Sequence, residues 1–390
     1  MRRVDNNHYD RRTVLKGIGG VAGAGALAGC SGSNDSGGSG GDSGGDSGGD
    51  SGGDSGGNND TSTPAPVTYD ATMGIVETEL NQIPSLTALR TMLPEVSDEN
   101  LTGSYRTFRD SSLPMQAMIG GEVDYYALSF GNVIQAHLAG NDIVTLGPKV
   151  TGTDYQFVIR NDIEADSLEE LVNGDYTIGV AGLGGLSHVQ VAGILAQEGL
   201  ATDVEEAGIQ TIGGSGTRTA AVASGNIDAT IIHIDQVQRL ENENAPIKVL
   251  FDLKEYYPKF ISQSITVTRK FLESEEGQAH VENYMQVLLE ANELATKNFE
   301  WLYDHTQQLL ASPLEEEDAR ESWQFNAETI NAWQYEPEGY DNSDFEKYAQ
   351  ALVAGGVLTQ EQYDQVDFEE ILVHDYWDEA AANRDAERWL

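Results

Sequence analysis

Two stretches of this chain share one pattern: residues 112–128 read SLPMQAMIGGEVDYYAL, and residues 216–232 read GTRTAAVASGNIDATII. Both contain Ala, three residues, Gly, one residue, Val or Ile, and then Asp. The pattern places Asp124 and Asp228 at matching positions, 104 residues apart. A glycine between an amphipathic run and an apolar run is typical of a helix end before a strand. Each stretch is therefore expected to form a turn, a helix, a glycine cap and a strand.

This repeated unit lies in a longer region that alternates in the manner of an α/β fold. The expected strands are 123–129, 143–146, 155–159, 176–181, 209–212 and 229–233, and the expected helices include 115–119, 187–198 and 217–224. A repeat inside one doubly wound domain would look similar. We favour two lobes built on the same plan, because the offset between the two stretches is the length of a lobe.

Several segments resemble one family of transport proteins. Residues 115–147 (MQAMIGGEVDYYALSFGNVIQAHLAGNDIVTLG) and 227–240 (IDATIIHIDQVQRL) resemble the nitrate/sulfonate/taurine substrate-binding proteins of ABC importers. That family shares its fold with pyrimidine-precursor binding proteins of the thiamine pathway. Residues 166–200 resemble the family's entry into its second lobe, and residues 345–372 resemble its closing helices. The resemblance, to a lipoprotein of haloarchaeal type, covers most of residues 70–375, although residues 71–100 lack a recognisable first strand and helix.

The resemblance implies an α/β fold of the two-lobed type II periplasmic-binding-protein class, a clamshell in which each lobe is a mixed sheet flanked by helices. The chain would cross between lobes near Gly152 and Pro246. Residues 67–152 would then begin lobe 1, residues 153–246 would form lobe 2, and residues 247–390 would return to lobe 1 and add the C-terminal helices. A ligand would sit in the cleft, at the carboxyl ends of the strands.

Glycine-rich turns supply the first candidate ligand contacts. The loop 181–188 follows an expected strand and opens a helix, and helix N-termini favour anions. We expect ligand contacts from Gly184, Gly185, Ser187 and His188. A purely structural glycine turn with a capping serine would have the same sequence pattern. The equivalent turn after the next strand contributes Ser215, Gly216, Thr217 and Arg218.

Arginines mark matching turns in the two lobes. Arg218 stands at a helix start, where a cation is unfavourable unless an anion or carboxylate offsets it. Arg109 occupies the equivalent turn of the first lobe, together with Ser111 and Ser112. Either arginine could bind an anionic ligand, or instead pair with a nearby carboxylate such as Asp110.

Polar residues at strand ends complete the candidate site. Ser129 and Asn132 follow the strand after Asp124, and His233 and Gln236 follow the strand after Asp228. Tyr155, near the first crossing, could cover a ligand or serve the core or hinge. Asp124 and Asp228 themselves are expected to be structural.

The favoured function is that of an extracytoplasmic solute-binding protein that delivers a small anion, such as nitrate, a sulfonate or taurine, to an ABC permease. The alternative ligand is a neutral or cationic heterocycle, such as a thiamine pyrimidine precursor, held by Tyr155 and the amides of Asn132 and Gln236. No cofactor, metal or catalytic constellation is expected. The related pyrimidine-synthesising enzymes carry a cysteine-rich motif and a cofactor-binding lysine, whereas here no cysteine follows Cys30 and no lysine lies between Lys149 and Lys248.

The first residues have the features of an export signal. Arg11 and Arg12 open a basic segment that resembles a twin-arginine motif, and a short apolar run ends at 27–30, LAGC, which resembles a lipoprotein processing box. Residues 1–29 would be the signal, and Cys30 would carry the lipid. Residues 30–66, rich in Gly, Ser and Asp, would form a disordered linker. An incidental cysteine in a disordered tail is the alternative.

Composition constrains the environment and the partners. The 390 residues carry 64 Asp and Glu but 22 Lys and Arg, a net charge of −42. An acidic, lysine-poor surface suits strong brine, where the Debye length is about 3 Å and self-repulsion is screened. Scavenging of cations by surface carboxylates is the alternative. Nucleic acid is excluded as a partner by charge. We expect a monomer anchored at the outer face of the cell membrane; a surface-anchored adhesion protein remains a remote alternative.

Overall fold

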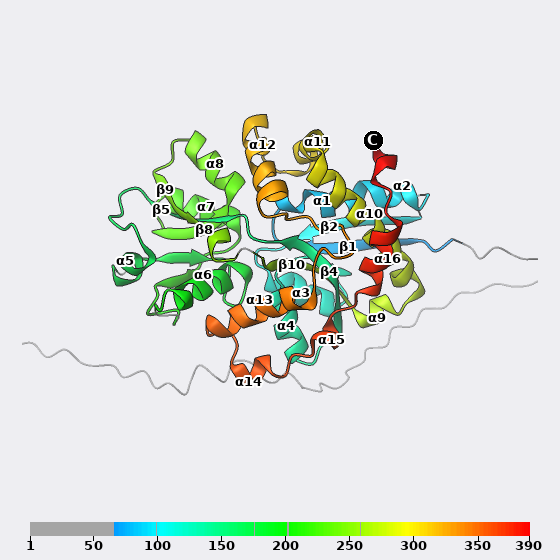
Figure 1. Ribbon diagram of the computed structural model, residues 1–390, viewed down its shortest axis with the longest axis horizontal. Coiled ribbons are helices and arrows are strands. Elements are labelled where there is room, and N and C mark those ends of the chain that lie inside the picture. The colour runs from blue at the N-terminus through cyan, green and yellow to red at the C-terminus, as the bar shows by residue number, and fades with distance from the viewer. Residues whose placement is uncertain (1–65, 99, 175, 201–202, 258) are drawn as a thin grey trace, which may run out of the picture. The chain divides into compact units, whose positions relative to one another are not determined.

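A computed structural model of the protein describes residues 66–98, 100–174, 176–200, 203–257 and 259–390. The expected signal segment, Cys30 and nearly all of the expected linker lie outside these residues. The described residues form two five-stranded mixed sheets with helices packed around them (Figure 1). Two sheets, rather than one doubly wound sheet, confirm the two-lobed α/β prediction.

The first sheet has the strand order β2-β1-β3-β10-β4. Strand β1 pairs in parallel with β2 and β3, and β10 pairs antiparallel with β3 and β4. The return strand β10 therefore lies between strands that precede lobe 2 in the sequence. The strand bounds are β1 Tyr69–Ile75, β2 Leu101–Thr107, β3 Tyr125–Tyr126, β4 Ile143–Thr151 and β10 Ile261–Thr268.

The second sheet repeats this plan with the order β7-β6-β8-β5-β9. Strand β6 pairs in parallel with β7 and β8, and β5 pairs antiparallel with β8 and β9. Its strands are β5 Tyr155–Arg160, β6 Ile178–Val180, β7 Ile209–Thr211, β8 Ala229–His233 and β9 Ile247–Asp252. Its helices are α5 Leu168–Asn173, α6 Leu186–Gln197, α7 Ser215–Ala223 and α8 Ile234–Asn242.

The chain passes between the sheets at two places. The first passage lies between β4, which ends at Thr151, and β5, which begins at Tyr155. The second lies between β9 and β10, after Asp252. The expected crossing at Pro246 is therefore wrong by several residues, because the segment after that proline forms one more strand of the second sheet.

The repeated sequence pattern has the same structural role in both lobes. Gly121 and Gly225 have positive φ angles of 74° and 76°, which a glycine adopts without steric cost. Asp124 accepts hydrogen bonds from the Tyr69 hydroxyl (2.8 Å) and the Thr72 amide (2.7 Å). Asp228 likewise accepts from the amide and hydroxyl of Thr177, each at 2.9 Å. Each aspartate thus fastens its strand to a neighbouring strand, as expected of a structural residue.

The segment after β1 is helical but broken. Prolines at positions 84 and 94 start short helices, since proline is tolerated only in a first turn. The pieces are η2 Leu80–Gln82, α1 Ile83–Thr87, the π-helical η3 Ala88–Met92 and α2 Leu93–Val96, followed in the first lobe by α3 Ser112–Ile119 and α4 Phe130–Leu138. This interrupted pattern explains why the sequence showed no regular helix here.

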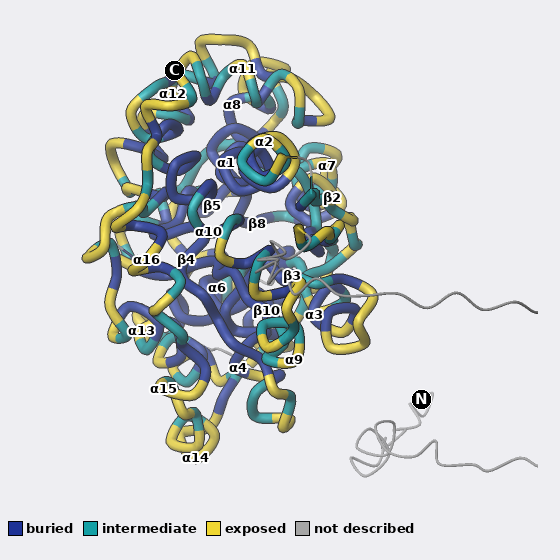
Figure 2. Tube along the Cα trace, turned by 90° about the vertical axis from the view of Figure 1, so that its right-hand side faces the viewer, coloured by how far each residue is buried: buried dark blue, intermediate teal, exposed yellow. Residues whose placement is uncertain are grey.

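The C-terminal third is a helical layer built on α10, Glu275–Lys297, which is largely buried in the core (Figure 2). The remaining elements are η4 Leu253–Glu255, α9 Arg269–Leu272, α11 Phe299–Leu309, α12 Glu316–Gln324, η5 Phe325–Thr329, α13 Asn342–Ala354, α14 Gln360–Tyr363, α15 Phe368–Ile371, α16 Asp375–Asn383 and η6 Ala386–Trp389. Among the described residues, none of the helices is both long and apolar enough to cross a membrane.

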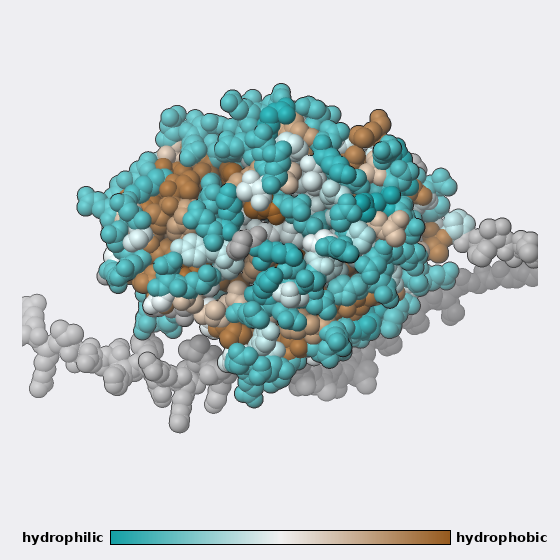
Figure 3. Space-filling view, in the orientation of Figure 1, coloured by the Kyte–Doolittle hydropathy of each residue, from teal (hydrophilic) through white to brown (hydrophobic). Residues whose placement is uncertain are grey.

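Helix α12 also contacts the second lobe through α8. The Asn242 amide donates to Asp318 (2.7 Å) and the Ser322 hydroxyl donates to Gln238 (2.6 Å), while Arg239 donates to the carbonyl of Ser312 in the loop before α12 (3.2 Å). The lobes are thus joined by these bonds as well as by the two crossings. The face seen in Figure 3 is mostly hydrophilic, as the acidic composition requires, with hydrophobic residues gathered over the lobe that carries β5 and β9.

Candidate functional site

A small cavity of about 50 Å³ lies between the two sheets. One water needs roughly 10–15 Å³ of such space, so the cavity has room for a few waters or for a compact ligand. Both lobes contribute to its wall. The residues that line it are Val76, Glu79, Gln82, Ser111, Leu128, Ser129 and Gln263 from the first lobe, and Tyr155, Ala181, Leu186, Ser187, Gly214, Ser215 and Arg218 from the second.

Arg218 is the cation of this cavity. Its side chain is carried by the first turn of α7, and the residue is 1% exposed. The guanidinium donates to the carbonyls of Gly213 (2.8 Å) and Ile231 (3.1 and 3.3 Å), and no carboxylate of a described residue lies within 4.0 Å. A buried charge without a partner ion is costly, and carbonyl dipoles offset only part of that cost. The guanidinium retains N–H donors beyond these three bonds, because it has five.

Two glutamine side chains on the cavity wall have unpaired oxygens. The Oε1 atoms of Gln82 and Gln263 are buried, and no hydrogen-bond partner for them is found among the described residues. Gln82 Nε2 donates to Glu79 Oε2 at 3.1 Å. Since an ionised carboxylate accepts but cannot donate, this bond fixes the amide nitrogen of Gln82 on the Glu79 side. Its oxygen is therefore an acceptor in need of a donor.

A buried charge cluster supports the cavity from the side of the first crossing. His233 Nε2 lies 3.0 Å from Glu79 Oε1, and His233 Nδ1 lies 2.8 Å from Asp154 Oδ1. Burial alone would lower the pKa of His233, but the negative charges of Asp154 and Glu79 raise that pKa well above its usual value. Burial alone would raise the pKa of Glu79, but the charge and hydrogen bonding of His233 lower it to about 2. The histidine is thus a cation held between two carboxylates.

The start of helix α7 is already occupied by a carboxylate of the protein. Glu77 Oε2 accepts a hydrogen bond from the Gly216 amide (2.8 Å) and lies 3.0 Å from the Ser215 hydroxyl, whose proton is shared with Glu79. A carboxylate satisfies the free N–H groups and positive end of a helix N-terminus as an anionic ligand would. The expectation that Gly216 offers its N–H to a ligand is therefore wrong, because Glu77 of the other lobe takes that bond.

Six of the residues expected to bind ligand line the cavity, namely Ser111, Ser129, Tyr155, Ser187, Ser215 and Arg218. Three others lie close by but bond within the protein. Asn132 donates to the Tyr126 hydroxyl and the Ser111 carbonyl, Gln236 donates to the Ser215 hydroxyl, and His233 belongs to the charge cluster. Asn132 and Gln236 are absent from the cavity wall. Their amides therefore do not provide the contacts that were expected to bind a heterocyclic ligand.

Three expected residues lie away from the cavity. The Arg109 side chain is 85% exposed and pairs with Asp110 at 3.5 Å, which is the alternative that the sequence left open. Ser112 donates to the same aspartate (2.7 Å), and Thr217 is exposed. Position at matching turns therefore did not make the two arginines equivalent: α7 directs Arg218 inward, whereas the turn before α3 leaves Arg109 in solvent.

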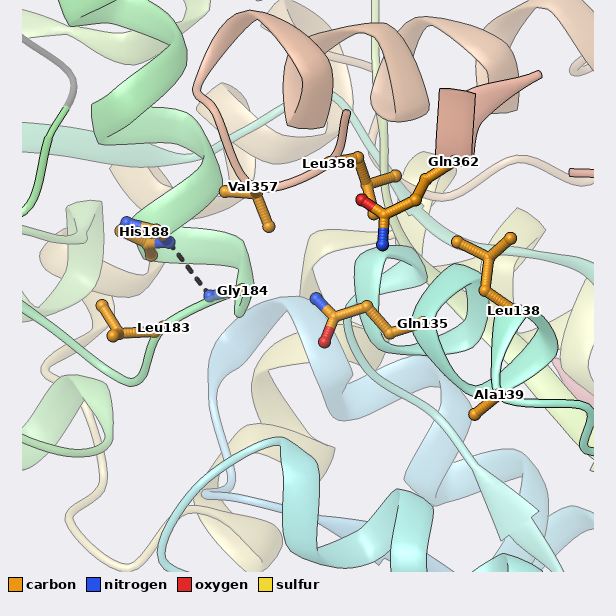
Figure 4. A pocket seen from close by; sticks show the side chains of 9 residues that line it. All are labelled: Gln135, Leu138, Ala139, Leu183, Gly184, His188, Val357, Leu358 and Gln362. Atoms are coloured by element: carbon orange, nitrogen blue, oxygen red, sulfur yellow. Dashed lines mark hydrogen bonds between the residues drawn. The ribbon is translucent and has the colours of Figure 1, made fainter. Parts of the chain in front are cut away.

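Gly184 and His188 line a second, larger groove of about 520 Å³ rather than the cavity (Figure 4). Gly184, at φ +79°, packs against Gln135 and donates its N–H to His188 Nδ1 at 2.9 Å. Burial lowers the pKa of His188, so the ring is a neutral acceptor at Nδ1. Gly185 and Ser187 are used internally: Gly185 packs closely on Ser111, and the Ser187 hydroxyl accepts from the Ala181 amide.

The sequence did not identify Glu79, Gln82 and Gln263 as parts of the site. The first two lie in the broken helical segment that no periodicity marked. Gln263 lies in β10, in a fully buried run of strand residues, and a glutamine at such a position was the available signal.

Among the described residues, no group of three His, Cys, Asp or Glu side chains is placed to hold a metal ion. Lys149 is buried and donates to the Ala127 carbonyl at 2.7 Å, and burial lowers the pKa of its amine to about 7.

Comparison with solved structures identifies the fold. The periplasmic nitrate-binding protein of Synechocystis PCC 6803 superposes with a TM-score of 0.66 at 11% identity, over 82% of this chain and 89% of that one. The alkanesulfonate-binding protein of Xanthomonas axonopodis pv. citri, bound to MOPS, gives 0.63 at 14% identity over 80% and 100%. A zinc-bound ligand-binding component of an ABC-type import system from Staphylococcus aureus gives 0.64 at 10% identity over 80% and 99%.

No curated protein matches the sequence. The family model described as NMT1/THI5 like matches residues 98–300, which is more than half of the chain. This span contains both copies of the repeated pattern, both crossings and Arg218. The chain therefore belongs to the NMT1/THI5-like family.

Proposed function

We propose that this protein is an extracytoplasmic solute-binding protein, which captures a small anion in the cavity between its lobes and delivers it to an ABC import permease. The observation that carries this proposal is Arg218, a buried cation that faces the cavity without a carboxylate partner among the described residues. An anion bound there would supply the missing countercharge. Nitrate and alkanesulfonate, the ligands named for two structural neighbours, are anions of this kind.

The closed arrangement of the lobes supports the capture of a ligand. Glu77 and Glu79 of the first lobe reach Gly216 and His233 of the second, so the polar bonds that close the cleft are in place around the cavity. A ligand held by groups from both lobes stabilises the closed state through its differential affinity for that state. A permease could then recognise the closed form.

A neutral or cationic heterocycle is the second candidate. Tyr155 lines the cavity, and its ring lies 5.9 Å from the Arg218 guanidinium, so an aromatic wall is present. The cavity volume of about 50 Å³ and the inward-facing cation favour the smaller, anionic class.

The proposal includes export and anchoring. A twin-arginine signal at Arg11 and Arg12 would direct export, and a lipid on Cys30 would tether a monomer to the outer face of the membrane. The Gly/Ser/Asp segment would act as the linker, and the net charge of −42 would suit a salt-rich medium. We propose a binding role rather than an enzymatic one, since the structural neighbours named above are described as binding proteins.

Isothermal titration calorimetry in molar salt tests the proposed function. Nitrate, propane-1-sulfonate, taurine and an aminopyrimidine would each be titrated into the protein and into Arg218→Gln. Loss of the charged hydrogen bonds should weaken anion binding more than tenfold, because such bonds contribute about 1.5–3 kcal/mol. Arg109→Gln is the matched control, since it removes an arginine from the solvent-exposed turn. Circular dichroism would verify that both variants fold. Equal anion affinity in Arg218→Gln and Arg109→Gln, or heat from the pyrimidine alone, would refute the assignment.

A further inference from the structure

We infer that the cavity selects a small oxyanion that also carries a hydrogen-bond donor. Gln82 is the residue that would accept the hydrogen bond from this donor. The inference rests on the proposed function and narrows its ligand class. It separates hydrogen carbonate or an amino-sulfonate, which carry O–H or N–H groups, from nitrate or a simple alkanesulfonate, which carry acceptors alone.

The anionic end of such a ligand would be held by Arg218. The free N–H groups of its guanidinium can donate only, so they select acceptor oxygens. Ser111 and Tyr155 add hydroxyls to the same wall, and hydroxyls adapt as donor or acceptor. Any small oxyanion would satisfy this part of the cavity, which therefore supplies affinity for charge without selecting among oxyanions.

Gln82 introduces the selection. The residue is 1% exposed, and its Oε1 atom is buried without a partner among the described residues. The assignment of amide oxygen and nitrogen is fixed chemically, because Nε2 lies 3.1 Å from the carboxylate oxygen of Glu79. Glu79 is an ionised acceptor, held so by His233, and exchanging the amide atoms would place two acceptors together. Gln82 lines the cavity, and its buried oxygen requires a donor.

Gln263 supplies a second buried amide oxygen that lacks a hydrogen-bond donor among the described residues. Its Oε1 atom is also buried without a partner in the described part of the chain, and the residue is 5% exposed on the return strand β10. Unlike Gln82, this side chain has no bond to another described residue that fixes its amide, so it can turn to match either a donor or an acceptor. Gln82 is accordingly the residue that distinguishes ligands with a hydrogen-bond donor from ligands without one. The amide of Gln263 adopts whichever orientation suits the bound ligand.

The charge of the wall limits the ligand further. Glu79 lines the cavity beside Gln82, so a second negative charge at that end would be repelled. The expected ligand has one anionic group near Arg218 and a neutral or positive donor near Gln82 and Glu79. Leaving a buried polar atom unpaired is the main cost of binding an analogue that lacks the donor.

The test compares matched ligands in the folded protein by calorimetry in molar salt at pH 8. Hydrogen carbonate and nitrate are planar monoanions of similar size that differ by an O–H group. Taurine and propane-1-sulfonate differ by an ammonium in place of a methyl group. In each pair the donor-bearing ligand should bind more than about tenfold more tightly, because the donorless analogue leaves Gln82 unpaired.

Gln82→Leu should bring the ratio within each pair close to one and leave the affinity for nitrate within about threefold. Gln135→Leu is the matched control. Gln135 also lies in the first lobe near the other lobe but faces the open groove (Figure 4), so the ratios should stay as in the parent protein.

The outcomes distinguish this inference from the proposed function. Donorless anions that bind as tightly as their partners, through an interaction that Arg218→Gln abolishes, would overturn the inference alone. Preserved discrimination in a folded Gln82→Leu would overturn the role of Gln82. Absence of binding by every anion would overturn the proposed function, and the inference with it. The ratio in the parent protein decides the ligand class even if Gln82→Leu fails to fold.

Discussion

The ion pair between Glu79 and His233 links the two lobes and should be worth several kilocalories per mole. Glu79→Gln removes the negative charge but keeps an oxygen that can accept from Ser215. The pKa of Glu79 falls from 4.5 to about 2 in the folded protein. At 1.36 kcal/mol per pKa unit, this shift corresponds to a stabilisation of about 3 kcal/mol at pH 7. That figure agrees with the roughly 3–5 kcal/mol expected when a buried pair loses one partner.

The pH dependence has a definite sign. The folded-state pKa of Glu79 is below its unfolded value, so its contribution is fully present above about pH 4.5 and is lost as the pH falls toward 2. The difference in free energy of unfolding between the parent and Glu79→Gln should therefore be about 3 kcal/mol at pH 7. It should shrink steadily below pH 4.5.

Urea unfolding in molar salt would measure this difference, followed by the fluorescence of the buried Trp333 and Trp377. Glu77→Gln is the control, because it removes an equal charge that is hydrogen-bonded to the start of α7, at the Gly216 amide, and leaves the contact between Glu79 and His233 in place. A carboxylate at a helix N-terminus contributes about 0.3–1 kcal/mol, so its loss should be smaller. An equal loss in the two variants, or a Glu79→Gln deficit that persists unchanged at pH 3, would refute the reasoning.

Three further predictions concern the whole chain. Circular dichroism across a salt titration should show structure lost in dilute buffer, because the net charge of −42 then lacks screening; full stability at millimolar salt would contradict this. Cys30→Ser should release the protein from cells into the medium, measured by immunoblot of membrane and medium fractions, and undiminished membrane attachment would argue against a lipid anchor. Asp124→Asn and Asp228→Asn should each destabilise the protein by about 1–3 kcal/mol in urea unfolding, because each aspartate accepts a backbone amide and a hydroxyl; Asp228→Asn should cost more, since it also loses the ion pair with Arg160 at 3.0 Å. A large loss from one and none from the other would contradict their shared structural role.

The lobes were predictable because the repeat encodes backbone geometry. A positive-φ glycine and a strand-fastening aspartate are local requirements, so they leave the same short pattern wherever the unit occurs. The second crossing was not predictable in the same way. Pro246 reads as a break in structure, but only pairing with β5 reveals that the next six residues extend the second sheet.

The candidate site was predictable only in its strand-end residues. Ser129, Ser187 and Ser215 line the cavity because turns after parallel strands meet at one edge of a sheet. Glu79 and Gln82 follow no such rule, since both lie at a broken helix and the partner of Glu79, His233, is more than 150 residues away in the sequence. Arg109 and Arg218 show the limit of analogy between lobes, because burial rather than sequence position decides which arginine meets the cavity.

The bonds between α8 and α12 bear on how the lobes could separate. If the lobes opened as two rigid sheets, Asn242, Gln238 and Arg239 would all have to leave their partners, at about 0.5–1.5 kcal/mol for each bond. If α12 and the loop before it, which carries Ser312, instead travelled with α8, those bonds would survive. The part of the protein that moves with the second lobe would then include α12, which follows both crossings in the sequence. The connections on either side of α12 would serve as additional hinges. The mechanical boundary of this clamshell need not coincide with the boundary between its sheets.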